Sequence, residues 1–166
     1  MKTIVDKTLA QRGSVYGKYA DGLIFRGTLV KMMCQECEET TGNMLSSDVI
    51  AFTDIIGKIS RLLVVPGHKD SWVDLAGYAR LNQNRFKKHQ ETTPVKDPAG
   101  MQIFAMCYWE AIDGVVKRYA ILATEDYERK AMTIGKHCYG ISRAPTSIKA
   151  WKALADYAEK IAKGLK

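Results

Sequence analysis

The residues with the clearest capacity for chemistry are two pairs of carboxylates. Glu36 and Glu39 lie three residues apart, and Asp70 and Asp74 lie four residues apart. On a helix either spacing places both side chains on one face, where two unpaired anions repel each other unless a cation binds between them. Carboxylates from facing helices suit Mg²⁺ or Mn²⁺. Each spacing is therefore typical of a carboxylate pair that takes part in a divalent metal site.

Both pairs also have an ordinary structural explanation. Asp70 is a suitable N-cap for a helix, and Asp74 would then follow in the first turn, where the helix dipole favours an anion. Glu36 and Glu39 are equally typical of a charged helix end. The sequence by itself leaves the two interpretations open.

A second group of residues could hold a phosphorylated ligand. On a helix, Asp54, Lys58 and Arg61 fall near one edge, from which the two cations can reach a cleft and bind a polyphosphate. The rings of Tyr16 and Trp72 could stack on a base. The alternative is a surface ion pair between Asp54 and Lys58, with the aromatic rings packed in the core.

Three helices are predicted before residue 90 to position these side chains. Apolar residues recur at three- and four-residue spacing over 22–37 and again over 49–64, which indicates one buried stripe on each helix. Pro66-Gly67 ends the second helix. Asp70 or Ser71 is placed to cap a third, which carries Trp72 and ends in a polar run.

The second part of the chain is less regular. Residues 91–100 (ETTPVKDPAG) predict a linker between a helical domain at 1–90 and an extension at 101–166, which could pack together as one unit. Residues 101–124 suit either a small β-hairpin or a helix, and residues 148–161 predict an amphipathic helix. We detect no internal repeat. The predicted fold class is all-α, with that hairpin as the one possible exception.

Composition narrows the classes of protein. The 166 residues are 46% hydrophobic and carry a formal net charge of +7, which is typical of a folded domain with a basic surface. No apolar run approaches the ~20 residues of a membrane span. We therefore expect no membrane partner, a cytoplasmic location (that of the infected host cell if the protein is viral) and reduced cysteines.

Three strings carry a resemblance to a known family. They are Arg12-Gly-Ser-Val-Tyr-Gly-Lys-Tyr19, Ile55-Ile-Gly-Lys-Ile-Ser-Arg61 and Asp70-Ser-Trp-Val-Asp-Leu-Ala-Gly-Tyr-Ala79. In this order, over residues 10–85, they resemble a phage family of small helical proteins, the MazG-like nucleotide pyrophosphohydrolases or dATP/dGTP diphosphohydrolases. The resemblance implies an all-α, Mg²⁺-dependent homo-oligomer. Such an enzyme cleaves a nucleoside triphosphate between its α- and β-phosphates and releases a monophosphate and pyrophosphate.

The resemblance also assigns roles to residues. In the MazG superfamily a Glu-x-x-Glu and a Glu-x-x-Asp on successive helices hold the metal. Glu36 and Glu39 match the first element, whereas Asp70 and Asp74 depart from the second by their spacing of four. The implied catalytic residues are Glu36, Glu39 and Asp74. The implied substrate-binding residues are Lys58, Arg61, Tyr16 and Trp72.

Three functions follow as hypotheses. The first is a Mg²⁺-dependent pyrophosphohydrolase that turns a nucleoside triphosphate into a monophosphate. The second is a non-catalytic protein that sequesters a nucleotide. The third, which we favour least, is a small basic nucleic-acid-binding protein whose cluster Arg85-Phe86-Lys87-Lys88 contacts phosphates.

Overall fold

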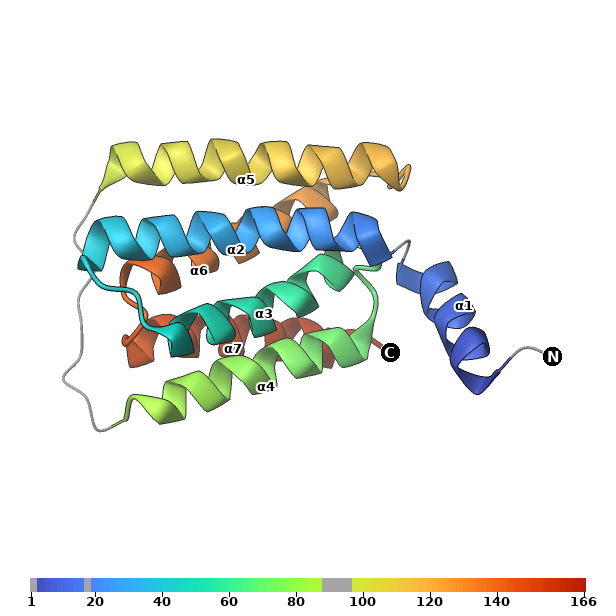
Figure 1. The fold of residues 1–166 in the computed structure, drawn as a ribbon, viewed down its shortest axis with the longest axis horizontal. Coiled ribbons are helices and arrows are strands. Elements are labelled where there is room, and N and C mark those ends of the chain that lie inside the picture. Colours follow the sequence, from blue (N-terminus) through green and yellow to red (C-terminus); the bar gives the residue numbers. More distant parts are fainter. Residues whose placement is uncertain (1–2, 17–18, 88–96) are drawn as a thin grey trace.

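The regular elements of the described chain are all α-helices. The structure, a computed structural model, describes residues 3–16, 19–87 and 97–166. Side chains are described for all of these residues except those within 14–21. Figure 1 shows the helices, and α1 extends away from the bundle formed by the others. The helices are α1 (Ile4–Tyr16), α2 (Tyr19–Thr41), α3 (Ser46–Val64), α4 (Lys69–Arg85), α5 (Pro98–Arg118), α6 (Glu125–Arg143) and α7 (Ile148–Gly164). The predicted all-α class is therefore confirmed.

Side-chain caps determine where four of the helices begin. The N-cap of α4 is His68, whose Nδ1 accepts a hydrogen bond from the backbone N–H of Ser71 at 3.2 Å. Asp70 lies inside the helix, so its predicted capping role is wrong. The residue before each of three other helices accepts a hydrogen bond in the same way: Asp97 for α5, Thr124 for α6 and Ser147 for α7.

The alternative β-hairpin at residues 101–124 is wrong, because α5 occupies most of that segment. Asp97 Oδ1 accepts from the N–H of Gly100 at 3.0 Å, and Pro98 stands at the first helical position. Phe104, Tyr108 and Ile112 follow at four-residue spacing, and all three are buried. This stripe packs on the bundle, and that burial favours the helix over the hairpin.

The bundle consists of two consecutive three-helix units with matching helix boundaries. The first unit is α2–α4 and the second is α5–α7. Helices α5, α6 and α7 each begin 79 residues after α2, α3 and α4, and α6 and α7 also end 79 residues after α3 and α4. The predicted linker at 91–100 overlaps the junction of the units, but residues 98–100 already belong to α5, and residues 91–96 lie outside the described chain.

Matching residues at this offset show that the units are repeats. Both α4 and α7 follow a proline, Pro66 or Pro145, and both carry a tryptophan six residues later. Trp72 Nε1 donates to the carbonyl of Pro66 at 2.8 Å, and Trp151 Nε1 donates to that of Pro145 at 2.7 Å. The string Leu-Ala-x-Tyr-Ala follows each tryptophan, at 75–79 and at 154–158. The prediction of no internal repeat is therefore wrong.

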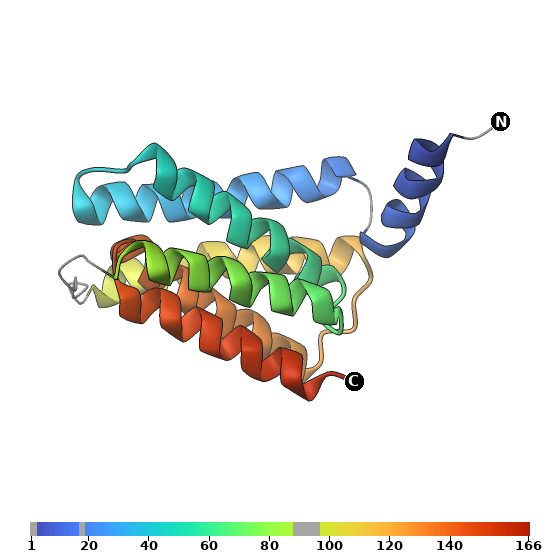
Figure 2. The same ribbon diagram turned by 90° about the horizontal axis from the view of Figure 1, so that it is seen from below.

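The two units pack face to face like the halves of a dimer. Each helix of the first unit runs opposite to its counterpart in the second, as the colours of Figures 1 and 2 show. Helix α4 packs along α7, α2 packs against α5 and α6, and α3 packs against α5. Arg80 and Glu159 occupy equivalent positions and form an ion pair of 3.0 Å between α4 and α7. The two units are therefore related by an approximate two-fold rotation axis, which passes between α4 and α7.

The core lies between the units and is lined by both. Its largest fully buried side chains include the two tryptophans, Tyr108 and Phe52. The ring of Trp72 in the first unit contacts that of Tyr157 in the second edge-on, with centroids 6.0 Å apart. No described helix is both long enough and apolar enough to cross a membrane.

The buried thiol of Cys138 and the buried hydroxyl of Tyr127 predict that the protein becomes less stable at alkaline pH. Burial raises the pKa of the Cys138 thiol from 9.0 to about 12, and it raises the pKa of the Tyr127 hydroxyl from 10.0 to about 12. The unfolded chain ionises first, so their stabilisation is complete below pH 9.0 and is lost as the pH rises to about 12. We expect the urea midpoint of unfolding to fall across this range.

The matched comparison for this prediction is the variant Cys138→Ala/Tyr127→Phe, which lacks both titrating groups. Its urea midpoint should fall less steeply over the same pH range, although it will be lower at neutral pH. Identical slopes for the variant and the natural protein would contradict the assignment, because lysine deprotonation affects both chains equally.

Candidate functional site

The structure brings together two of the predicted site residues on the outer face of α3 and α4. Lys58 Nζ on α3 lies 2.6 Å from Asp74 Oδ2 on α4, and the two side chains are 18% and 48% exposed. The same ammonium lies 5.8 Å from the centre of the Tyr78 ring. A cation, a carboxylate and an aromatic ring therefore meet at a surface that water reaches. We call Lys58, Arg61, Asp70, Asp74 and Tyr78 the α3–α4 face.

Arg61 and Asp70 extend this face toward the α3–α4 loop. Arg61 follows Lys58 by three residues on α3, and Asp70 precedes Asp74 by four residues on α4. Because the two helices are antiparallel neighbours joined by residues 65–68, both side chains lie about one turn nearer the loop. Asp70 is exposed and Arg61 is half-buried. The face thus carries two cations and two carboxylates.

Glu36 is placed elsewhere and is already engaged. It is buried on α2, where its Oε1 accepts from Arg143 Nη1 at 2.8 Å and from Thr40 Oγ1 at 3.4 Å. Arg143, at the end of α6, also contacts Asp97 Oδ2 at 3.3 Å. Glu39, one turn further along α2, is exposed. This buried ion pair joins the two units and engages one oxygen of a carboxylate that was predicted to bind metal.

The four predicted metal ligands do not converge within the chain. Glu36 and Glu39 lie near the end of α2, whereas Asp70 and Asp74 lie near the start of α4, and Figure 1 shows these two points toward opposite ends of the bundle. A 17-residue helix such as α4 is about 25 Å long. Within the described residues, no three His, Cys, Asp or Glu side chains are grouped to hold a metal ion. The single four-carboxylate site is therefore corrected to two separate pairs.

The aromatic assignments also change. Trp72 is 1% exposed and its Nε1 is bonded to the carbonyl of Pro66, so its ring is a core residue that a base cannot reach. Its predicted role in substrate binding is wrong. Tyr16 ends α1, and its side chain lies outside the described part of the structure. Tyr78, half-buried beside Lys58, is the described aromatic residue that the face presents.

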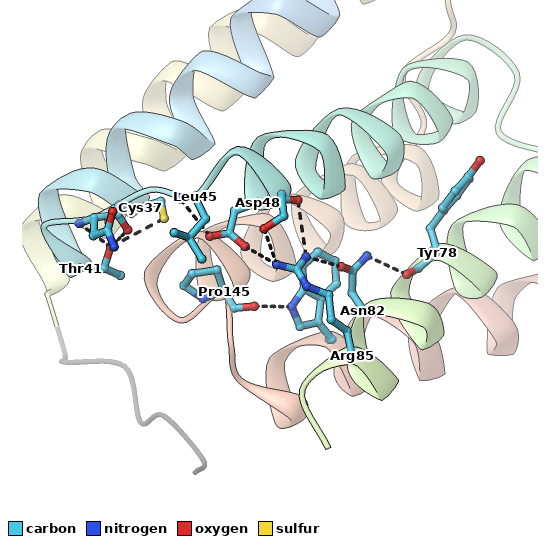
Figure 3. A network of polar contacts seen from close by, with 11 residues as sticks. Cys37, Thr41, Leu45, Asp48, Tyr78, Asn82, Arg85 and Pro145 are labelled. Carbon is cyan, nitrogen blue, oxygen red and sulfur yellow. Dashed lines mark hydrogen bonds and ion pairs between the residues drawn. The ribbon is translucent and has the colours of Figure 1, made fainter. Parts of the chain in front are cut away.

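A second polar network ties the start of α3 to the end of α4, and sequence reasoning missed it. Figure 3 shows Arg85 with its guanidinium directed at the carboxylate of Asp48, 3.1 Å away. It also donates to Ser47 Oγ at 2.7 Å, while Asn82 Nδ2 donates to the carbonyl of Tyr78 at 3.0 Å. Asp48 is buried, so this pair has a structural role. The signal in the sequence was an acid placed directly after Ser46-Ser47, at the start of an apolar helical stripe.

The same network alters the basic cluster at the end of α4. Arg85 is paired with Asp48, and its guanidinium carbon lies 4.5 Å above the ring of Phe86. Phe86 itself is buried. Half of the Arg85-Phe86-Lys87-Lys88 string therefore serves packing, Lys87 is exposed, and Lys88 lies outside the described residues.

The fold and the face define a duplicated all-α protein that carries a mixed-charge surface on its first unit. Comparison with known proteins adds no family: no protein-family model matches the chain, and neither a curated protein nor a solved structure is significantly similar to it. The function is therefore argued from the α3–α4 face.

Proposed function

We propose that the α3–α4 face binds a nucleoside triphosphate together with Mg²⁺. The observation that carries the proposal is the Lys58–Asp74 contact of 2.6 Å on an exposed surface, beside the ring of Tyr78. Lys58 and Arg61 offer positive charge for the phosphates. Tyr78 offers an aromatic surface for the base. The net charge of +7 favours the approach of an anion in general.

The two carboxylates of the face fit a magnesium ion that arrives with its nucleotide. Mg²⁺ is commonly bound by one or two protein carboxylates, with substrate phosphates and water completing the shell. Asp70 and Asp74, spaced by four on one side of α4, would hold it and would otherwise repel the phosphates. Bound there, the ion would neutralise phosphate charge. Glu36 does not fit such a site, because its ion pair with Arg143 is buried, whereas Asp74 is 48% exposed despite its pair with Lys58.

A second candidate function is hydrolysis of the same nucleotide to a monophosphate and pyrophosphate. The observation that favours it is that Asp74 remains 48% exposed despite its ion pair. A carboxylate in this position can accept a proton from water or orient it for attack on phosphorus. Lys58, in contact with that carboxylate, would hold the polyphosphate in place. This candidate agrees with the resemblance of the three strings to the pyrophosphohydrolase family.

The homo-oligomer remains a prediction that the resemblance supplies. Its reason was that enzymes of this kind build sites where helices of neighbouring subunits meet. This chain already packs two related units against each other. Sedimentation of the full chain would show whether it assembles further.

The first experiment measures binding and turnover in the same samples. The full chain is mixed with each common nucleoside and deoxynucleoside triphosphate and Mg²⁺ or Mn²⁺, and thermal shift and pyrophosphate release are followed. We expect at least one nucleotide to raise the melting temperature. Lys58→Met should weaken that nucleotide about tenfold or more, because it removes a charged contact worth about 1.5–3 kcal/mol.

The matched control is Lys130→Met, in the second unit. Lys130 is 23% exposed and pairs with Asp126 at 2.7 Å, so the variant removes the same charge from a similar environment. Its affinity should stay within about twofold. An equal loss of affinity in both variants would mean that Lys58 acts only through the net charge of the protein. If no triphosphate binds the natural chain, the proposal is refuted. Pyrophosphate release that Asp74→Asn abolishes would establish the second candidate.

A further inference from the structure

The second unit carries a counterpart of the α3–α4 face, formed by α6 and α7, at the offset of 79 residues. Its aromatic position is unchanged, because Tyr157 matches Tyr78. Its charged positions all differ. His137 stands for Lys58, Gly140 for Arg61, Lys149 for Asp70 and Ala153 for Asp74.

The geometry of the counterpart is retained although its chemistry is not. The centroids of the His137 and Tyr157 rings lie 5.5 Å apart, close to the 5.8 Å between Lys58 Nζ and the Tyr78 ring. Burial lowers the pKa of His137, which keeps its ring neutral at neutral pH. Ala153 has no carboxylate to hold a cation, and Gly140 has no side chain to hold a phosphate. The second face therefore keeps the aromatic ring but lacks the two cations and the two carboxylates that the first offers, at the equivalent positions, to a Mg²⁺–nucleotide.

The units have also diverged where they meet. At the approximate two-fold axis, equivalent positions of two identical units would place like charges together. Here Arg80 faces Glu159, its own counterpart, at 3.0 Å, and it also contacts Asp156 at 2.6 Å. The second unit thus holds α4, the helix that carries Asp70 and Asp74, through charges that the first unit does not have. Each unit has become specific for the other.

We propose that each chain has one anionic-ligand site, on the first unit, and that the second unit is its structural support. The inference rests on the proposed function and adds the number and place of sites. Under this inference the two units share the same fold, whereas the four charged residues that bind the ligand are found in the first unit. A protein built of two equivalent units is thereby asymmetric in binding.

Amide NMR spectra of the full chain can locate the site. The probes are inorganic tripolyphosphate and dATP, each added with Mg²⁺. We expect saturable shifts around Lys58, Arg61 and Asp74, and none at the matching positions of α6 and α7. Comparable shifts around His137 and Tyr157 would overturn the single-site inference and leave the proposed function standing. No shifts with either probe would overturn the proposed function and this inference with it.

A transfer of charges tests the same inference in the opposite direction. The variant His137→Lys/Gly140→Arg/Ala153→Asp places three of the four charged residues of the first face on the second unit and leaves Lys149 unchanged. At two of the three positions the first added carbon is accommodated, because a Cβ added at Gly140 meets no heavy atom within 4 Å and Ala153 is exposed. With an otherwise unchanged spectrum, new tripolyphosphate shifts should emerge on α6 and α7. If these shifts are absent although the variant is folded, the missing charged residues do not explain why the α6–α7 face fails to bind, and the inference is overturned.

Discussion

Replacing Arg143 with methionine is expected to lower the free energy of unfolding by about 3–5 kcal/mol. The guanidinium is 7% exposed and lies 2.8 Å from Glu36, which is itself 10% exposed. Removing the cation, which also lies over the Tyr139 ring, leaves a buried carboxylate with Thr40 as a weak partner. The loss is large because the carboxylate that remains is only 10% exposed and is therefore poorly hydrated. Urea unfolding followed by circular dichroism measures it.

The double variant Glu36→Met/Arg143→Met separates the worth of the ion pair from the cost of breaking it. Replacing both members of a buried pair by apolar side chains is often neutral or stabilising. The chain already has apolar residues at the two positions that correspond to this pair, because Val115 is the counterpart of Glu36 and Val64 is the counterpart of Arg143. We expect the double variant to recover most of the lost stability. A double variant as unstable as Arg143→Met alone would contradict the stranded-charge explanation.

Replacing either Trp72 or Trp151 with alanine is expected to cost about 3–5 kcal/mol, the usual range for a large aromatic residue in a core. Both rings are 1% exposed, and both indole N–H groups donate to a proline carbonyl six residues earlier. The two losses should be similar, because the repeat places the rings in equivalent settings. Chemical unfolding of the two single variants provides the comparison.

Trp109→Ala is the matched control for these tryptophans. Its side chain is 41% exposed on α5, so it removes the same atoms from a surface position. The cost there should stay near 1 kcal/mol or below, about the range of surface substitutions. A loss at Trp109 equal to that at Trp151 would refute the ranking by burial. A large loss at only one of Trp72 and Trp151 would refute the equivalence of the units.

The sequence by itself predicted four of the described helices, α2, α3, α4 and α7, because the signals for them are local, whereas it did not predict α1 or α6. The apolar stripes over 22–37 and 49–64 and the caps Asp97 and Ser147 lie within a few residues of the groups they act on. Even so, residues 101–124 stayed ambiguous until tertiary burial of Phe104 and Tyr108 decided for α5. Lys58 and Asp74 were selected as candidates by their spacing, and the structure showed that they touch.

The repeat escaped sequence reasoning because the two units share few residues. Their identical positions are concentrated around the tryptophans, where packing leaves little choice, while the surface and most of α2 and α5 differ. The equal offset of the three helix starts, and the equal lengths of α3 and α6 and of α4 and α7, revealed the relation. Core shape restrains a few residues per helix, and the remaining positions are free to change.

Only the tertiary structure decided which charges meet. Glu36 and Arg143 are 107 residues apart in the chain and 2.8 Å apart in space, and no local pattern encodes that contact. The opposite placement of the two carboxylate pairs follows from the up-and-down course of α2, α3 and α4, which periodicity does not reveal. Helix formation depends on neighbours in sequence, whereas a binding site depends on how helices pack, and packing is decided by the whole core.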